Sequence, residues 1–157
     1  MSQVSIGLFK AVFNHMTHRV GYLLGAKAPY NDCDSSLIRS IDCSGFSLYA
    51  VYRASVGTIL MPHGSQNQHA WAEKQGFHKL AEYSDVLYAK DDPGRLFICF
   101  MGVQTDGHGH VWLVGSDGKG NMVTYESHAG VGVSSRPWDT SVLKLNCNAA
   151  YELPCKA

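Results

Sequence analysis

The sequence predicts an α+β fold, with helices in the first half of the chain and an antiparallel β-sheet in the second. Before residue 76, apolar residues recur every three or four positions, as they do on one face of a helix. After residue 93, they form short aromatic or β-branched runs that are separated by turns rich in glycine and aspartate. Helices followed by a meander of strands are typical of an α+β domain.

The first helix is expected at residues 4–20, where apolar side chains follow a helical period. Residues 21–42 are expected to form a loop. Gly25, Pro29 and the run Asn-Asp-Cys-Asp-Ser-Ser all favour turns there.

Two further helices follow the loop. Residues 43–56 have an apolar face, and Gly57 is expected to end that helix. Residues 62–75 read as a loop and then a third helix. Ser65 is the expected N-cap of this helix, and Gly76 its expected end.

Four strands are expected in the second half of the chain, in short aromatic or β-branched runs that are separated by turns. They are residues 95–101, 110–114, 121–127 and 142–145.

The composition indicates one domain, residues 1–157, and argues against several classes of partner. The chain is 45% hydrophobic and 17% charged, and it is long enough to bury a core without disulfides or metals. Thirteen basic and thirteen acidic residues give zero net charge, so we expect no nucleic-acid and no membrane partner. The longest apolar stretch, residues 96–103, is too short to span a bilayer.

The first residues do not resemble a secretion signal, because Asn14, His15 and His18 interrupt any apolar segment. We therefore expect a protein that is made in a cytosol, trimmed, or exported without a signal peptide.

Cysteines and histidines give no metal pattern. Five cysteines leave at least one outside any intramolecular disulfide, although Cys147 and Cys155 can pair in an oxidising compartment. His15 with His18, and the pair in the stretch His-Gly-His at 108–110, lack third and fourth ligands. We expect no metal and no cofactor.

Cys43 is the candidate nucleophile, because the segment Asp-Cys-Ser-Gly-Phe places it where a loop meets a helix. The unpaired N–H groups and the dipole at a helix N-terminus stabilise a thiolate and make it reactive. Ser44 and Gly45 are small and leave the sulfur accessible. The alternative is an ordinary small buried residue behind an aspartate cap.

A thiolate nucleophile needs a base and a group that orients the base. His110 begins an alternating strand and is therefore held on a rigid element. Glu126 and His128 share one face of the next strand, and either can accept a hydrogen bond from the imidazole N–H of His110. A structural histidine at position 110 is the alternative.

These residues resemble those of the NlpC-type cysteine peptidases, papain-like hydrolases that cut the peptide stems of bacterial cell walls. The likeness runs in order from Gly21 to Gly132. The motifs are Gly-Tyr-Leu-Leu-Gly at 21–25 for Y-x-x-G, Asp-Cys-Ser-Gly-Phe at 42–46 for D-C-S-G-F, the stretch 62–68 for P-R-x-S-x-x-Q, Pro-Gly-Arg-Leu-Phe at 93–97 for P-G-D-L-x-F, and Gly-His-Val at 109–111 for G-H-V-G-I-Y. His63 stands in place of the family's arginine, and Arg95 in place of its aspartate.

The resemblance implies a papain-like fold with the nucleophile at a helix N-terminus, and it implies roles at matching positions. Cys43 would be the nucleophile, His110 the general base and Glu126 the third residue, with His128 as the alternative. The remaining expected oxyanion or substrate-binding residues are Tyr22, Asp42, Ser44, Ser65 and Gln68.

The predicted function is that of a peptidoglycan endopeptidase acting on stem peptides through a thioester acyl-enzyme. The alternatives are a papain-like amidase or thiol acyltransferase acting on other substrates, and a catalytically retired wall-binding or phage-tail module. We expect a monomer by default, and a protein that reaches the wall by phage release or by export without a signal peptide. For a secreted effector, we also expect a cognate immunity protein as partner.

Overall fold

A computed structural model describes residues 2–105 and 107–156 and confirms the α+β class. The helices are α1 (Ile6–Met16), η1 (Ser35–Leu37), α2 (Cys43–Ala54), α3 (Ser65–Lys74), η2 (Tyr83–Ala89) and α4 (Ser141–Asn146). The strands are β1 (Val4–Ser5), β2 (Leu96–Met101), β3 (His110–Ser116), β4 (Met122–His128), β5 (Gly132–Ser134), β6 (Ala149–Glu152) and β7 (Cys155–Lys156). Within the described residues, no helix is long and apolar enough to cross a membrane.

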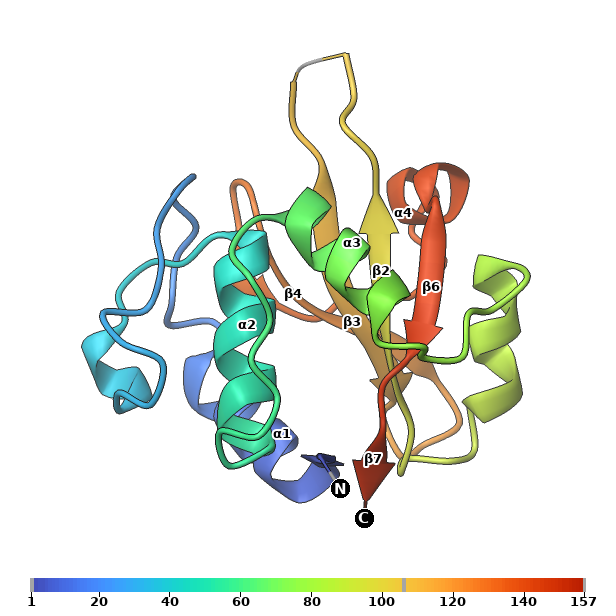
Figure 1. The fold of residues 1–157 in the computed structure, drawn as a ribbon, viewed down its shortest axis with the longest axis horizontal. Coiled ribbons are helices and arrows are strands. Elements are labelled where there is room, and N and C mark those ends of the chain that lie inside the picture. The colour runs from blue at the N-terminus through green and yellow to red at the C-terminus, as the bar shows by residue number, and fades with distance from the viewer. Residues whose placement is uncertain (1, 106, 157) are drawn as a thin grey trace.

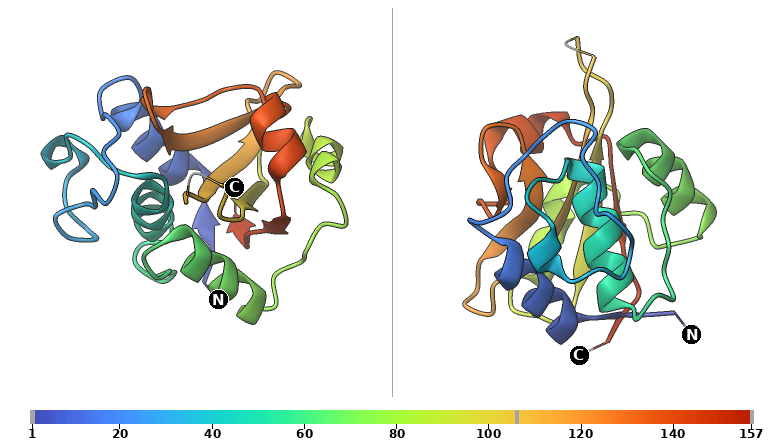
Figure 2. Two further views of the ribbon diagram at one scale, coloured as in Figure 1. Left: turned by 90° about the horizontal axis from the view of Figure 1, so that it is seen from above. Right: turned by 90° about the vertical axis from the view of Figure 1, so that its left-hand side faces the viewer.

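The main sheet is antiparallel throughout and has the strand order β5-β4-β3-β2-β6. Near the two ends of the described chain, β1 and β7 form a separate parallel pair. Figures 1 and 2 show α1 and α2 beside one face of the sheet, and α4 and η2 beside the other.

Both faces of the sheet are buried, which explains why β2 is apolar at every position. Val111 and Leu113 of β3 belong to the core that contains α1 and α2. Trp112 and Val114 point to the opposite face, into a second core with Trp138. The alternation of β3 predicted from the sequence is therefore confirmed.

The first helix, α1, is shorter at both ends than the predicted residues 4–20. The Ser5 hydroxyl caps α1 by accepting from the backbone N–H of Leu8 at 3.3 Å. At the other end, the backbone at Thr17 is extended, and His18 has a φ of 61°, so the helix ends at Met16.

The strand predicted at residues 142–145 is wrong, because this segment lies within helix α4. The carbonyl of Thr140 accepts from the backbone N–H of Leu143 and of Lys144, both at 2.9 Å, and starts a helical turn. Only Leu143 is buried, whereas Leu145 is 80% exposed. A short apolar run does not distinguish a strand from a helix that buries one side chain.

The last strand of the main sheet is instead β6, which pairs with β2 and begins with Ala149 and Ala150. Alanine is uncommon in strands, and strand preference therefore does not predict β6. Cys147, just before β6, and Cys155 in β7 are free thiols, and the Cys147 thiol interacts with Cys99 of β2.

The predicted cap of the third helix is also wrong. Gly64 is the N-cap of α3, with a φ of 89°, and Ser65 is the first helical residue. A φ in this range suits glycine, which has no Cβ to strain the backbone. The predicted helix end at Gly76, which has a φ of 73°, is confirmed.

Candidate active site

Asp42 sets the start of α2 and thereby the position of Cys43. Its Oδ1 accepts from the backbone N–H of Gly45 at 2.7 Å, which is the bond expected of an N-cap. Cys43 is the first residue of the helix and is 9% exposed. Gly45 has no room for a side chain, because a Cβ there would lie 2.9 Å from the carbonyl oxygen of Ala26.

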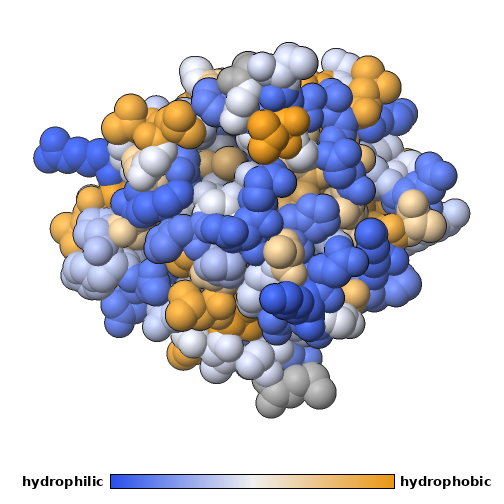
Figure 3. All heavy atoms as spheres, turned by 45° about the horizontal axis from the view of Figure 1, so that its top comes forward, coloured by the Kyte–Doolittle hydropathy of each residue, from blue (hydrophilic) through white to orange (hydrophobic). Residues whose placement is uncertain are grey.

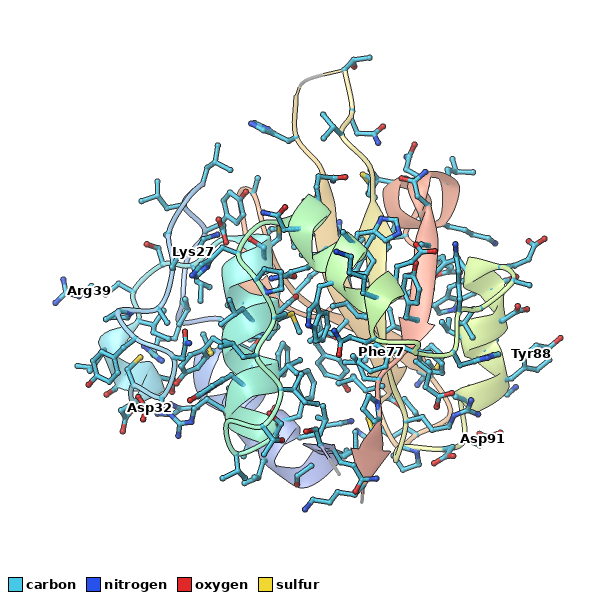
Figure 4. The ribbon with its side chains drawn as sticks, viewed as in Figure 1. Lys27, Asp32, Arg39, Phe77, Tyr88 and Asp91 are labelled. Carbon is cyan, nitrogen blue, oxygen red and sulfur yellow. The ribbon has the colours of Figure 1, made fainter. Side chains whose placement is uncertain are left out.

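Asp42 also ties the preceding loop to this helix end. Its Oδ2 accepts from Lys27 Nζ at 2.5 Å and from the backbone N–H of Gly25 at 3.2 Å. Lys27 Nζ also donates to the Ser44 hydroxyl at 3.0 Å, and its side chain lies at the upper end of α2 in Figure 4. Both oxygens of Asp42 are thus used within the protein, and Ser44 is 3% exposed.

Tyr22 comes from the same loop and lies near the sulfur. Burial first, and then the charges of Cys43 and Asp42, raise the pKa of Tyr22. Its hydroxyl therefore stays protonated at neutral pH and can donate a hydrogen bond near Cys43.

Gly109 allows β3 to begin against the start of α3. A Cβ at this position would lie 2.6 Å from Gln66 Nε2, 2.9 Å from the Met101 carbonyl oxygen and 3.1 Å from Ser65 Oγ. Ser65 thus lies beside the backbone that precedes His110. The close approach fixes where the strand starts, and hence where His110 lies.

The His110 ring is held from one side by Trp112. The two rings stack with centroids 5.5 Å apart and an interplanar angle of 19°. The Trp112 indole N–H donates to the Tyr83 hydroxyl at 3.0 Å, and this hydroxyl donates to the Trp138 carbonyl at 2.7 Å.

Glu126 of β4 contacts the far nitrogen of His110. Its Oε1 lies 2.8 Å from His110 Nε2, and the Glu126 side chain has no exposed surface. His128 lies two residues further on, at the end of β4, and its pKa is lowered mainly by burial. Of the two candidates for the third position, Glu126 makes the contact with Nε2.

Arg136, just beyond β5, was not expected from the sequence. Its guanidinium makes a two-point contact with Glu126, from Nε to Oε2 and from Nη2 to Oε1, both at 2.9 Å. Arg136 belongs to none of the quoted motifs, and no pattern links it to position 126.

The pKa values describe a polarised group of charges. Burial lowers the pKa of His110, but the hydrogen bonds and charges of Cys43 and Glu126 outweigh it and raise the pKa from 6.5 to about 9. Burial alone would raise the pKa of Glu126, yet His110 and Arg136 lower it from 4.5 to about 2. At neutral pH, His110 is therefore an imidazolium and Glu126 a carboxylate.

This arrangement leaves one imidazole nitrogen for the sulfur. Because Nε2 is engaged by Glu126, Nδ1 is the nitrogen available to exchange a proton with Cys43. A cysteine at a helix N-terminus beside an imidazolium is suited to nucleophilic chemistry.

Gln68 joins α3 to the residue next to Cys43. It is fully buried on α3, and its Nε2 donates to the carbonyls of Ser44 at 2.9 Å and Pro62 at 3.0 Å. Through these bonds Gln68 holds α3 against the first turn of α2.

Figure 3 shows the end of the molecule where α2 and β3 begin. Hydrophilic residues cover most of this face, and hydrophobic residues form separate groups on it. The exposed apolar side chains of the molecule include Leu23 and Leu24, each 61% exposed, in the loop that carries Tyr22.

Comparison with known proteins gives similarity in structure alone. No family model matches the sequence, and no curated protein matches it. A solved structure of a lipoprotein-like NLP/P60 family protein from Staphylococcus aureus has a TM-score of 0.59 and 15% identity. The match covers 96% of this chain and 42% of that one, so the chain spans less than half of the staphylococcal protein.

RipD from Mycobacterium tuberculosis is also similar, with a TM-score of 0.51 and 19% identity over 94% of this chain and 95% of that chain. RipD is described as a non-catalytic NlpC/p60 domain protein adapted to peptidoglycan binding. The fold implied by the sequence motifs is therefore confirmed: this chain has an α+β fold of the NlpC/P60 type.

Proposed function

We propose that this chain is a cysteine endopeptidase that hydrolyses amide bonds in the stem peptides of peptidoglycan. The observation that carries the proposal is the arrangement of Cys43, His110 and Glu126, with a buried carboxylate 2.8 Å from His110 Nε2. The description of RipD as adapted to peptidoglycan binding supports the cell wall as substrate.

The first half of the reaction forms a thioester. The Cys43 sulfur attacks the carbonyl carbon, and the oxygen, which becomes negative, accepts from the Cys43 backbone N–H and the Tyr22 hydroxyl. His110 then gives the Nδ1 proton to the amide nitrogen. The carbon–nitrogen bond breaks, and the free amine leaves.

The second half releases the acid. Neutral His110 takes a proton from water at Nδ1, and the resulting hydroxide attacks the thioester carbonyl. The carbon–sulfur bond breaks, which releases a carboxylic acid and restores the Cys43 thiolate beside the imidazolium. Glu126 stays ionised throughout and holds the orientation of the ring.

The decisive experiment is mass spectrometry of the products formed from defined muropeptides. Wild-type protein should produce a new amine and a new carboxylate from one stem bond. Cys43→Ala should produce neither, whereas Cys147→Ala, which removes a thiol outside the site, should act like wild type. A thiol acyltransferase would instead pass the acyl group to an acceptor other than water.

The second candidate is a binding module without catalysis, because RipD combines this fold with a non-catalytic role. The alkylation of Cys43 separates the two functions. An activated thiol reacts with iodoacetamide at about pH 6 much faster than an ordinary thiol. A Cys43 thiol that reacts at that pH no faster than a free thiol such as N-acetylcysteine, with no muropeptide cleaved, would favour the binding module.

A further inference from the structure

Arg136 and His110 share one buried carboxylate. Oε1 of Glu126 lies 2.8 Å from His110 Nε2 and 2.9 Å from Arg136 Nη2, and Oε2 accepts from Arg136 Nε at 2.9 Å. Arg136 thus supplies two contacts with the carboxylate, in addition to the contact with His110 and a hydrogen bond with the Thr124 side chain. A planar guanidinium that binds both oxygens fixes the rotation of a carboxylate as well as its position.

The backbone of Arg136 is itself fixed to the strand that carries Glu126. The Arg136 carbonyl accepts from the Thr124 N–H at 2.9 Å, and the Arg136 N–H donates to the Thr124 hydroxyl at 3.1 Å. Val123 and Pro137 form a bridge beside this contact. Two residues along β4 from Thr124, Glu126 lies within reach of the arginine side chain, which is 22% exposed.

The proposed reaction changes the charge of His110 twice in each cycle. While His110 is an imidazolium, Glu126 has a cationic partner. After His110 has given its proton to the leaving amine, a buried carboxylate without another cation would tend to take up a proton. Arginine is charged at every accessible pH and stays paired with Glu126 in both states.

We propose that Arg136 is a positioning residue: it fixes the orientation of Glu126 and keeps the carboxylate ionised while His110 cycles between its two protonation states. This inference rests on the proposed function for its catalytic part, and on the contacts of Arg136 alone for its electrostatic part.

Several other titratable groups face Glu126 and enter the same balance. These groups are His128 of β4, Tyr83 of η2 and Cys99 of β2. They add to His110 and Arg136, and Cys43 of α2 acts on Glu126 through His110. None of these added groups is a permanent cation, so the role of Arg136 cannot be filled by a neighbour in this set.

The experiment compares Arg136→Gln and Arg136→Lys with a matched arginine. Arg95 also makes a two-point contact with a carboxylate of the sheet, Glu152, at 2.7 and 2.9 Å, but at the far end of β2 from His110. Arg95→Gln therefore controls for the loss of such a pair. The readouts are kcat and KM on a defined muropeptide across pH, the rate of Cys43 alkylation across pH, and Tm.

We expect Arg136→Gln to raise the pH at which kcat/KM falls on the acid side, because Glu126 then protonates more readily. Removing a group that orients a site residue typically costs about 10- to 100-fold in activity at metal sites, and we expect kcat to fall by a similar factor with KM nearly unchanged. Arg136→Lys keeps the charge but not the two-point contact, so its acid limb should stay near wild type while kcat falls.

An acid limb and a kcat in Arg136→Gln that match wild type, or shifts that Arg95→Gln reproduces, would overturn the proposal. If Arg136→Gln does not fold, a wild-type kcat in Arg136→Lys has the same meaning. Alkylation of Cys43 needs no substrate. A change in its pH dependence in Arg136→Gln, in a protein that cleaves no muropeptide, would support the electrostatic role and contradict the proposed function.

Discussion

Glu126→Gln tests how far the carboxylate controls His110. Burial opposes ionisation of Glu126, and yet its neighbours lower its pKa from 4.5 to about 2. A difference of this size is equivalent to about 3 kcal/mol in favour of the carboxylate, or a factor of a few hundred. Since His110 and Arg136 supply most of that effect, the same order of magnitude applies to the imidazolium that Glu126 stabilises.

Glutamine keeps the shape of the side chain but has only one acceptor. Arg136 donates to both oxygens of Glu126, and His110 donates to one of them. The NH₂ group of a glutamine would therefore face either an arginine N–H or the imidazole N–H. The guanidinium also loses its counter-charge and repels the imidazolium.

We expect kcat/KM of Glu126→Gln to fall about 100-fold at neutral pH. The pKa of His110 is about 9 in the native protein, so the alkaline limb of the rate profile should lie near that pH. In Glu126→Gln that limb should move to lower pH by about 1 to 2 units, because the imidazolium has lost its anionic partner. The assay is muropeptide cleavage followed from acid to alkaline pH, with Tm measured in parallel.

Glu152→Gln is the matched control, since Glu152 is also bound at two points by an arginine. It should leave the alkaline limb in place. An unchanged limb in Glu126→Gln, in a folded protein, would refute the idea that this carboxylate holds the proton on His110.

Three further predictions concern stability. Gly109→Ala should destabilise the protein by about 1–3 kcal/mol in urea unfolding, because the added Cβ meets backbone as well as side chains, whereas Gly7→Ala in α1 should stabilise it slightly; equal effects would argue against the close approach. Asp42→Ala should cost about 1–2 kcal/mol through loss of the cap and slow the alkylation of Cys43, and an unchanged unfolding midpoint would contradict this. The raised pKa of His110 should stabilise the fold fully below pH 6.5, and this contribution should be lost as the pH rises through about 9. Cys43→Ala should lose less over that range, as followed by the free energy of unfolding, and an equal loss would exclude Cys43 as a partner of the ring.

The parts of the site that the sequence predicts are those set by local rules. An aspartate followed by small residues fixes the start of α2, because the cap and the first turn involve neighbours in sequence. Alternation in β3 places His110 and Trp112 on one face for the same kind of reason. Local rules failed at residues 142–145, which lie in a helix that buries Leu143 and exposes Leu145. They also failed at β6, where alanines with a low strand preference pair with β2.

The family motifs predict where polar residues lie in the chain, but they do not predict what each polar side chain contacts. Asp42 and Gln68 match polar positions of the family pattern, and we expected them to contact substrate. Their known hydrogen bonds are internal: Asp42 joins a loop to α2, and Gln68 joins α3 to Ser44. A polar side chain in a motif can thus be needed because it positions the nucleophile helix.

The support of His110 from the segment that follows β5 lies beyond any local rule. Arg136 reaches the ring through Glu126, and two residues later the Trp138 carbonyl reaches it through Tyr83 and Trp112. Both routes depend on the pairing of this segment with β4. The Thr124 N–H donates to the Arg136 carbonyl, and the Trp138 N–H donates to the Met122 carbonyl. The imidazole is therefore held at its nitrogen and at its face by one stretch of chain. A change in the connection between β4 and this stretch should disturb both contacts together, even though it alters no residue of the proposed triad.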